Sequence, residues 1–246
     1  MKIALVGYGK MGKAVETIAL RHEHEIVCRL GRDAASADPA LLRKADVAIE
    51  FSNAASAAKN ILQCFDAGIP VVSGTTGWNE QLESVGKVAQ EKKAAFFYAS
   101  NFSIGVNIFF ELNAALAQMM NTQKQYHDIR IHEVHHVHKT DSPSGTAISL
   151  ADQIIQRIER IHSWKNFNGG DASVPLHHPK NILPVLSLRE DDVPGTHRVT
   201  YVSSQDSLEM IHTAFNREGF AEGALAAAQF IIGKHGIFGM RDLLRF

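Results

Sequence analysis

Cysteine is scarce in this sequence. The 246 residues contain two, Cys28 and Cys64, and both lie in apolar surroundings. Two isolated cysteines without a CxxC pair exclude a fold that depends on a disulfide framework. We therefore predict that both are buried free thiols that act as small apolar side chains.

Neither sign of charge dominates. Lysine and arginine number 25 and aspartate and glutamate 26, so the formal net charge is −1, which gives no electrostatic argument for a nucleic acid or an anionic membrane as partner. No apolar run approaches the roughly 18 residues needed to span a bilayer. The N-terminal residues also lack the basic stretch, long apolar run and cleavage site of a secretory signal. We expect a cytoplasmic protein that binds neither nucleic acid nor membrane.

Short apolar runs alternate with stretches of helical spacing over the first hundred residues. The predicted strands are Lys2–Val6, Glu25–Leu30, Val47–Phe51, Val71–Ser73 and Ala95–Tyr98. The predicted helices are Lys10–Arg21, Ala54–Ala67 and Asn79–Lys93. Repeated strand–helix–strand units with right-handed crossovers predict an α/β fold with a Rossmann-type doubly wound parallel sheet.

The pattern changes after about residue 105. Further strands are predicted at His127–Val137, Val185–Leu188, Gly195–Ser203 and Asp206–Ala214, and helices at Val106–Met120, Ala147–Ile161 and Gly219–Ile232. Residues 162–180 are polar and rich in Gly, Pro and His, which predicts a loop. We expect a dinucleotide-binding domain formed by residues 1–105 and 217–246. Residues 106–216 would form a second α+β domain with a mixed, more antiparallel sheet.

A glycine-rich turn follows the first predicted strand. The motif is GxGxxG, and its residues are Gly7, Tyr8, Gly9, Lys10, Met11 and Gly12. The first glycine permits the tight turn, the second lets a pyrophosphate approach the backbone, and the third lets helix and strand pack closely. The helix then offers free N–H groups to the phosphates. Because the motif stands between a strand and a helix, it predicts a dinucleotide site rather than a plain glycine turn.

The end of the second predicted strand bears on cofactor preference. An acidic residue there binds the ribose 2′-OH of NADH, whereas an arginine favours the 2′-phosphate of NADPH. Gly31 and Arg32 occupy the position, with Asp33 just beyond. The hypothesis is that Arg32 makes NADPH acceptable or preferred; the alternative is that Arg32 is a solvated surface charge. NADPH and NADH both remain candidate cofactors.

Two more loops follow predicted strands at the edge where a doubly wound fold binds its ligands. The small and hydroxyl-bearing residues in them suit a nicotinamide and its carboxamide. One loop contains Gly74, Thr75 and Thr76, and the other contains Ala99, Ser100, Asn101 and Phe102.

The segment from Glu133 to Ala147 combines proton-transfer groups with an anion site. If the strand continued, His135 and Lys139 would share one face with Glu133. A histidine and a lysine together offer an acid–base group near neutral pH and a persistent cation. The run Ser144-Gly145-Thr146 then opens a predicted helix, whose N-terminus suits a carboxylate.

Two alternatives apply to the histidines of this segment. One is a metal site, since five histidines lie close in sequence: His127, His132, His135, His136 and His138. No cysteine lies nearby and Lys139 disfavours a cation, so we predict no metal. The other is a set of surface histidines on a polar edge, which leaves the adjoining anion pocket unexplained.

The segment EVHHVHKTDSPSGTA resembles the signature of the dihydrodipicolinate reductase family, E-x-H-H-x-x-K-x-D-x-P-S-G-T-A. Further likeness extends over nearly the whole chain, in the segments DVAIEFS, GTTGW, ASNFSIGVN and GFAEGALAAAQFIIGKHGIFGMRDLL. The resemblance implies reduction of 4-hydroxy-tetrahydrodipicolinate, a cyclic dicarboxylate, to tetrahydrodipicolinate with NADH or NADPH. It places the enzyme in the diaminopimelate route to lysine.

The resemblance also implies roles for individual residues. His135 would be the acid–base residue and Lys139 the proton donor. His136 would contact substrate together with Ser144, Gly145 and Thr146. The family is commonly homotetrameric through the sheet of its second domain, so the second domain would serve both substrate binding and oligomerisation.

Two other functions compete with this interpretation. One is a different two-domain nicotinamide oxidoreductase, acting on a sugar or a semialdehyde. A semialdehyde dehydrogenase needs a nucleophilic cysteine, and neither Cys28 nor Cys64 is suitably placed. The other is a redox sensor that binds the dinucleotide without catalysis. A sensor has no need of a His/Lys pair beside an anion pocket.

Overall fold

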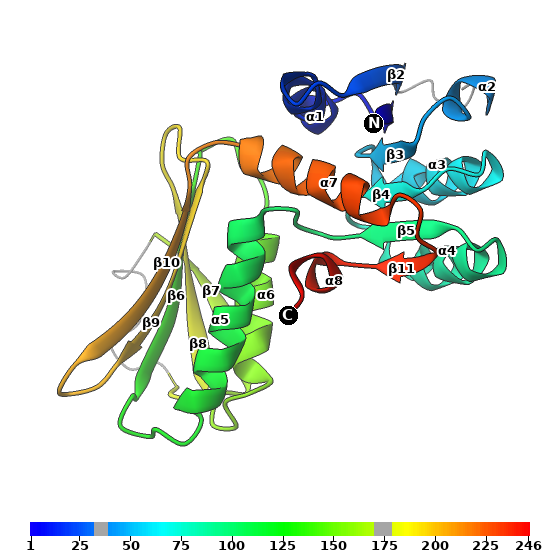
Figure 1. The fold of residues 1–246 in the computed structure, drawn as a ribbon. Helices are drawn as coiled ribbons and strands as arrows, with labels where there is room; N and C mark the ends of the chain where they lie inside the picture. Colours follow the sequence, from blue (N-terminus) through cyan, green and yellow to red (C-terminus); the bar gives the residue numbers. More distant parts are fainter. Residues whose placement is uncertain (32–38, 170–178) are drawn as a thin grey trace. The chain divides into compact units, whose positions relative to one another are not determined.

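The computed structural model describes residues 1–31, 39–169 and 179–246, which form two compact units (Figure 1). The first unit contains Met1–Ile104 and Arg217–Phe246, and the second contains Gly105–Asn216. Arg32 lies outside the described residues, as does part of the predicted loop 162–180. Among the described helices, none combines the length and apolarity needed to cross a membrane.

The first unit is built on a parallel sheet with strand order β11-β5-β4-β3-β1-β2. The strands are β1 (Lys2–Val6), β2 (Glu25–Leu30), β3 (Val47–Glu50), β4 (Val71–Ser73), β5 (Ala95–Tyr98) and β11 (Gly236–Phe238). Alternate residues of β1 enter different cores: Ile3 and Leu5 pack in one, Ala4 and Val6 in the other. A sheet buried on both faces requires such continuous apolar strands. The predicted doubly wound parallel sheet is confirmed.

Helices cover the two faces of this sheet (Figure 1). They are α1 (Lys10–Arg21), α2 (Pro39–Leu42), α3 (Ala54–Asp66), α4 (Asn79–Glu91), α7 (Glu218–Ile231) and α8 (Met240–Leu244). Side chains of α1 and α7 share the core that contains Ile3, whereas α3 and α4 contribute to the core that contains Ala4. Strand β11 and helices α2 and α8 were not predicted, because elements of three to five residues are too short to show a periodicity.

The second unit contains a mixed sheet with strand order β10-β9-β6-β8-β7. The strands are β6 (Asp128–His135), β7 (Ser163–Asn168), β8 (Ile182–Arg189), β9 (Gly195–Val202) and β10 (Ser207–Ala214). Strand β9 runs antiparallel to β6 and β10, whereas β6, β8 and β7 are parallel. Two helices, α5 (Ile104–Met120) and α6 (Gly145–Ile155), lie along one face (Figure 1). The predicted mixed sheet is confirmed.

Two predictions in this unit are wrong in detail. Part of the predicted loop 162–180 is strand β7, whose Trp164 pairs in register with Leu183 of β8. Its polar residues hid the strand, since Asn166 bonds the Ser187 hydroxyl at 2.8 Å instead of packing in an apolar core. Strand β6 also ends at His135, because the backbone turns there and the Lys139 N–H bonds the His136 carbonyl at 3.0 Å.

Strand β6 runs from the hydrophobic core to the beginning of the segment Glu133–Ala147, and its side chains alternate between the two faces of the sheet. Ile129 and Ile131 point into the core beneath the helices. Glu133 and His135 lie on the same face at the carboxyl end of the strand, since every second residue of a strand shares a face. Both are buried. The strand therefore presents two ionisable groups where the apolar core ends.

Candidate active site

The three glycines of the GxGxxG turn differ in what surrounds them. A Cβ on Gly7 would lie 2.0 Å from the Phe51 carbonyl oxygen, and Gly7 has a left-handed φ of +94°. A Cβ on Gly12 would lie 2.3 Å from the Gly7 carbonyl oxygen. Nothing lies within 4 Å of the corresponding point at Gly9. The protein itself thus needs the first and third glycines, and the second leaves the backbone open for a ligand.

A cavity of about 630 Å³ adjoins this turn. Its lining comes from the ends of β1, β2 and β3 and from the first turns of α3, and includes Gly7, Tyr8, Gly9, Gly31, Phe51, Ser52, Asn53, Ala55, Ser56, Lys59 and Asn60. Lys59 is the one charged side chain in this described lining. Exposed helix N–H groups, an open Gly9 and a cation suit the phosphates of a dinucleotide.

The other predicted residues of this turn face different ways. The Tyr8 hydroxyl bonds Glu16, which also accepts from the Arg29 Nε at 2.8 Å. Gly9 and Lys10 are exposed, and Met11 is half-buried. Arg29, the described basic residue on β2, is therefore held by a carboxylate on α1.

A buried carboxylate joins the loops that follow β3 and β4. Glu50 is fully buried and accepts hydrogen bonds from the hydroxyls of Ser73 at 2.7 Å and Thr75 at 2.8 Å. It also accepts from the backbone N–H of Ser52 at 3.0 Å. Glu50 was not among the predicted site residues, although an acidic residue at the end of the apolar strand Val47–Glu50 is a signal in the sequence.

The predicted loop residues divide into exposed and structural ones. Thr76 and Ser100 are exposed, and Gly74 packs against Phe51, whose ring leaves no room for a Cβ. Ala99 is buried, and the Asn101 side chain accepts from the Ser103 N–H at 2.9 Å. Phe102 is a core residue whose ring lies 5.7 Å from that of Phe51.

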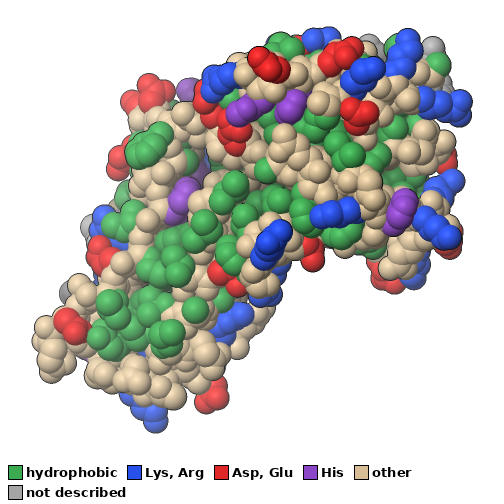
Figure 2. Space-filling model, viewed as in Figure 1, with side chains coloured by type: hydrophobic (Ala, Val, Ile, Leu, Met, Phe, Trp, Pro, Cys, Tyr) green, Lys and Arg blue, Asp and Glu red, His purple; other side chains and the backbone are tan. Residues whose placement is uncertain are grey.

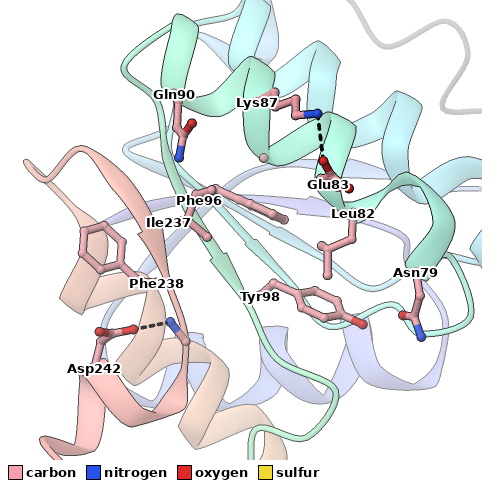
Figure 3. Close-up of a pocket in the computed structure, with 12 residues that line it drawn as sticks. Asn79, Leu82, Glu83, Lys87, Gln90, Phe96, Tyr98, Ile237, Phe238 and Asp242 are labelled. Atoms are coloured by element: carbon pink, nitrogen blue, oxygen red, sulfur yellow. Dashed lines mark hydrogen bonds and ion pairs between the residues drawn. The ribbon is translucent and has the colours of Figure 1, made fainter.

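A further cavity in the first unit, of about 740 Å³, lies between α4 and the β11–α8 segment (Figure 3). Phe96, Tyr98 and Ile237 form its apolar floor, and the Lys87–Glu83 ion pair lies at its rim. None of the predicted site residues lines it. It therefore offers no group for the predicted chemistry.

In the second unit the register of the sheet gathers the chemistry-bearing side chains. Glu133 of β6 stands opposite His197 of β9 on one side and Ser187 of β8 on the other. His135 stands opposite Arg189. Residues directly opposite each other share a face of the sheet and contact one another. Three strands thus bring five polar side chains together.

Glu133 is the centre of this cluster. It is fully buried and accepts from the Ser144 N–H at 3.0 and 3.1 Å and from the Arg189 guanidinium at 3.3 Å. Burial alone would raise the pKa of Glu133, but hydrogen bonds from His135, Ser144 and Ser187 lower it below its ordinary range. Glu133 is therefore a carboxylate at neutral pH.

The two buried histidines lie on either side of this carboxylate. The His135 Nε2 is 3.3 Å from the His197 Nε2 and 3.5 Å from the Glu133 Oε2. The His135 Nδ1 is 3.3 Å from the Pro194 carbonyl oxygen. Burial, and then the neighbouring His135, lower the pKa of His197 and keep its ring neutral.

Lys139 and His136 lie beyond the end of β6. The Lys139 ammonium bonds both oxygens of Asp141 at 2.7 Å. Burial opposes ionisation of Asp141, but this bond lowers the pKa of Asp141 overall. The His136 ring is half-buried, 6.3 Å from that of His138. The lysine is therefore a charged donor with a local acceptor.

Ser144, Gly145 and Thr146 form the beginning of α6. Ser144 is the N-cap residue, and its hydroxyl accepts from the Ala147 N–H at 3.2 Å and lies 3.1 Å from the His197 Nε2. Gly145 is exposed, with nothing within 4 Å of the point that a Cβ would occupy. Ser144 anchors the turn inward, and Gly145 faces open space at a helix N-terminus.

The structure adds residues that the sequence analysis missed in this cluster. His197, Arg189 and Ser187 come from β8 and β9, at least 43 positions along the chain from Ser144. Of the five histidines considered as metal ligands, only His135 belongs to the cluster. Arg189 and Ser144 already bond its carboxylate, so we interpret it as a hydrogen-bond network, and the expected lack of metal stays a prediction.

The sequence matches two family profiles. Residues 1–102 match the family described as dihydrodipicolinate reductase, N-terminus, and residues 105–244 match its C-terminal counterpart. A 4-hydroxy-tetrahydrodipicolinate reductase from Christiangramia forsetii is 46% identical over 244 residues, covering 99% of this chain and 98% of that protein. The same enzyme from Neisseria gonorrhoeae is 30% identical, covering 99% and 97%.

Solved structures share the fold. A dipicolinate-bound dihydrodipicolinate reductase from Paenisporosarcina sp. TG-14 superposes with a TM-score of 0.71 at 20% identity, covering 97% of each chain. An amine dehydrogenase from Mycobacterium smegmatis has a TM-score of 0.59 at 12% identity, covering 96% of this chain and 94% of that one. The chain belongs to the dihydrodipicolinate reductase family, the NAD(P)H-dependent 4-hydroxy-tetrahydrodipicolinate reductases of the diaminopimelate route to lysine.

Proposed function

We propose that His135 and Lys139 handle the protons of the reduction, and that His136, Ser144, Gly145 and Thr146 bind the substrate carboxylates. The observation that carries this proposal is the buried Glu133 cluster, which joins His135 directly to the first turn of α6. An ionised carboxylate, two histidines and an anion-binding helix end in one place suit acid–base chemistry on an acidic substrate.

The charges of the second unit suit a dicarboxylate. The Lys139 ammonium lies in the loop that leads to α6, and Gly145 leaves the N-terminus of this helix open. Both features attract anions. The fold neighbour from Paenisporosarcina binds dipicolinate, a planar dicarboxylate. We infer that this chain holds the carboxylates of its substrate at the beginning of α6.

Proton donation is what the chain itself adds to the chemistry. A bound nicotinamide supplies the hydride, and its addition builds negative charge on the conjugated C=C–C=N system of the substrate. A positioned acid quenches that charge as it develops. Lys139 is the cationic candidate for this acid, and His135 is the imidazole candidate.

We further propose that Gly7–Gly12, Gly74–Thr76 and Ala99–Phe102 form the cofactor site, and that NADPH is accepted at least as well as NADH. The described lining of the 630 Å³ cavity carries Lys59 and no carboxylate. An acid is the group that selects the ribose 2′-OH, and a cation tolerates the 2′-phosphate. Arg32 is the second cation assigned to this role.

A homotetramer is the assembly that we propose. Leu208 on β10 is 43% exposed, and Leu112 and Met119 on α5 are 54% and 66% exposed. Figure 2 shows hydrophobic side chains gathered on the surface of the second unit. Apolar area of this kind is typical of a surface that another subunit covers. Light scattering coupled to gel filtration would measure the mass, and a monomer would contradict the proposal.

A turnover assay tests the assigned residues. Purified protein should oxidise NADPH only when the condensation product of pyruvate and aspartate semialdehyde is present, and pyridine-2,6-dicarboxylate should inhibit. Thr146→Val should weaken the inhibitor by roughly tenfold, the effect of one lost hydrogen bond to a charged group. Thr122→Val, in an exposed turn of the same unit, is the matched control. Equal inhibition of both variants would contradict a carboxylate site at α6.

A further inference from the structure

Glu133 and His197 are buried ionisable groups to which the proposed chemistry gives no step. Their side chains lie within 4 Å of each other and of His135. Burying a carboxylate and a second histidine costs free energy unless both are well bonded. Because both groups contact the His135 ring, we expect them to serve a function through it.

We propose that Glu133 and His197 are positioning residues that hold the His135 ring in one orientation and tautomer and connect it to the Ser144–Thr146 turn. The proposal rests on the acid–base role assigned to His135 above. It adds two residues, one from the same strand and one from β9, that act on the reaction through His135 and Ser144.

The partners of the two ring nitrogens fix the tautomer of His135. The Pro194 carbonyl can only accept, so the Nδ1 facing it at 3.3 Å carries a hydrogen. The Nε2 faces the His197 Nε2 at 3.3 Å and the Glu133 Oε2 at 3.5 Å. The neutral ring can accept at Nε2 from His197, and the protonated ring can donate to the carboxylate. Both protonation states are thus accommodated without rotating the ring.

Gly195 is the reason that the ring fits at this place. A Cβ on Gly195 would lie 2.8 Å from the His135 Cε1 and 3.2 Å from its Nδ1. Contacts that short force a neighbour to move. The glycine that begins β9 therefore leaves the space that the imidazole occupies.

The same two residues hold the substrate-binding turn. Glu133 accepts from the Ser144 N–H, and the His197 Nε2 lies 3.1 Å from the Ser144 hydroxyl. Ser144 is the N-cap of α6, so its position sets the direction of the helix N-terminus. One network therefore sets both the position of the acid–base residue His135 and that of the proposed carboxylate site.

The charges around His135 come from several elements. Glu133 on β6 and Arg189 on β8 form an ion pair at 3.3 Å. Neutral His197 lies on β9, and His212 of β10 stands opposite His197 in register. Lys139 and Asp141 pair with each other in the loop after β6. Among the described residues, the charged group paired with the His135 ring is Glu133, at 3.5 Å, so we expect its replacement to change the field at the ring most.

Glu133→Gln and Glu133→Asp separate the charge from the shape. Glu133→Gln should lower kcat by roughly 10- to 100-fold. Loss of the negative charge also destabilises the protonated ring, so kcat/KM should decline at a lower pH than in the wild type. Glu133→Asp should keep the wild-type pH profile and recover part of kcat. Glu209→Gln on β10, whose carboxylate pairs with Arg198 on the other face of the sheet, is the control and should change neither.

Two more variants keep the test decisive should Glu133→Gln fail to fold. His197→Gln places an amide near the Nε2 position and should keep the turn, with a smaller loss of kcat than His197→Ala. Gly195→Ala should lower kcat without removing any polar group, because it displaces the ring. His127→Gln, at an exposed position of the same unit, is their control.

The outcomes distinguish this proposal from the function itself. Wild-type protein without NADPH turnover would contradict the proposed function. An active wild type with Glu133→Gln and His197→Gln at full kcat/KM would overturn the positioning role alone. If Glu133→Gln and Glu133→Asp lost kcat equally and kept the wild-type pH profile, the role of Glu133 would be structural. That result would also overturn the proposed positioning role.

Discussion

In the first unit the candidate site is bounded by turns at the ends of parallel strands, whereas in the second it consists of buried side chains from three strands and one helix. The cavity beside Gly7 and Gly9 is shaped by backbone that approaches closely because side chains are missing. The cluster around Glu133 depends on carboxylate, imidazole and guanidinium groups bonded to one another. One unit offers space and N–H groups, and the other offers ionisable groups.

The difference follows from the two kinds of sheet. In a parallel sheet all strands end at one edge, so the turns that follow them meet there. In the mixed sheet a carboxyl end of β6 lies beside the amino end of the antiparallel strand β9. Side chains of distant segments therefore face each other, as Glu133 and His197 do. The first unit suits a ligand recognised by its phosphates, and the second suits proton transfer.

The largest expected effect lies in the second unit. His135→Gln and Lys139→Ala should each lower kcat by roughly 10²–10⁴-fold, the contribution of a positioned general acid. Circular dichroism should show an unchanged fold. Lys124→Ala, in the exposed turn before β6, is the control. Near-normal turnover in both variants would refute the assignment of proton chemistry to this unit.

Alanine substitutions at Gly7 and Gly9 compare a glycine that the fold requires with one that leaves room for a ligand. Gly7→Ala should destabilise the first unit by about 1–3 kcal/mol or more, because its φ is left-handed and the Phe51 carbonyl is in the way. Gly9→Ala should leave the melting temperature unchanged and raise the KM for NADPH. Thermal melts and cofactor kinetics measure both. Equal melting temperatures for the two variants would show that the turn is not constrained as described.

Smaller effects are expected on the preference of the first unit for NADPH over NADH. Lys59→Ala and Arg32→Ala should each lower the preference for NADPH over NADH several-fold, as the loss of one charged contact does. Gly31→Glu should favour NADH, because nothing lies within 4 Å of the added Cβ and an acid there binds the 2′-OH. The ratio of kcat/KM for the two cofactors is the measurement. Lys87→Ala, in the lining of the other cavity of this unit, serves as the control. An unaltered ratio in the Lys59, Arg32 and Gly31 variants would remove the 630 Å³ cavity from cofactor selection.

How far the sequence predicts each unit depends on how local its determinants are. Strands β1 to β5 of the first sheet are apolar runs, and the glycines of the GxGxxG turn stand within six consecutive positions, so these strands and this turn were predicted from the chain alone. Strand β11 was not. His135, Lys139 and Ser144 were found for the same reason, since they lie in one segment. Whether they act as assigned stays a prediction.

Cross-strand neighbours are what the sequence did not reveal. The register that sets Glu133 opposite His197 depends on how β6 and β9 pair, and no local pattern specifies it. The same holds for Arg189. Strand β7 was not predicted because it contains polar residues such as Asn166 and Asn168, which form hydrogen bonds instead of packing in an apolar core. Glu50 was overlooked as the last residue of a buried strand, where its partners come from the next loop.

The smallest expected effect is a dependence of stability on pH that belongs to the second unit. The pKa of His197 is 6.5 in an unfolded chain and lower in the folded protein. Below pH 6.5 the unfolded chain therefore binds a proton that the folded protein does not. The free energy of unfolding is at its full value above pH 6.5 and falls as the pH is lowered below 6.5. The slope from His197 is at most about 1.4 kcal/mol per pH unit.

His197→Gln isolates this contribution. Urea titrations at pH 7.5 and 5.5 give the free energy of unfolding, and the difference between the two values should be smaller in His197→Gln than in the wild type. Glu133 acts in a lower window, because its lowered pKa gives stability that is lost only as the pH falls below about 4.5. His212 and His24 contribute slopes of the same sign, since burial lowers both their pKa values, but these slopes persist in the variant and cancel. An identical pH dependence in the two proteins would mean that folding leaves the pKa of His197 unchanged, which would contradict the neutral, buried His197 on which the proton arrangement at His135 depends.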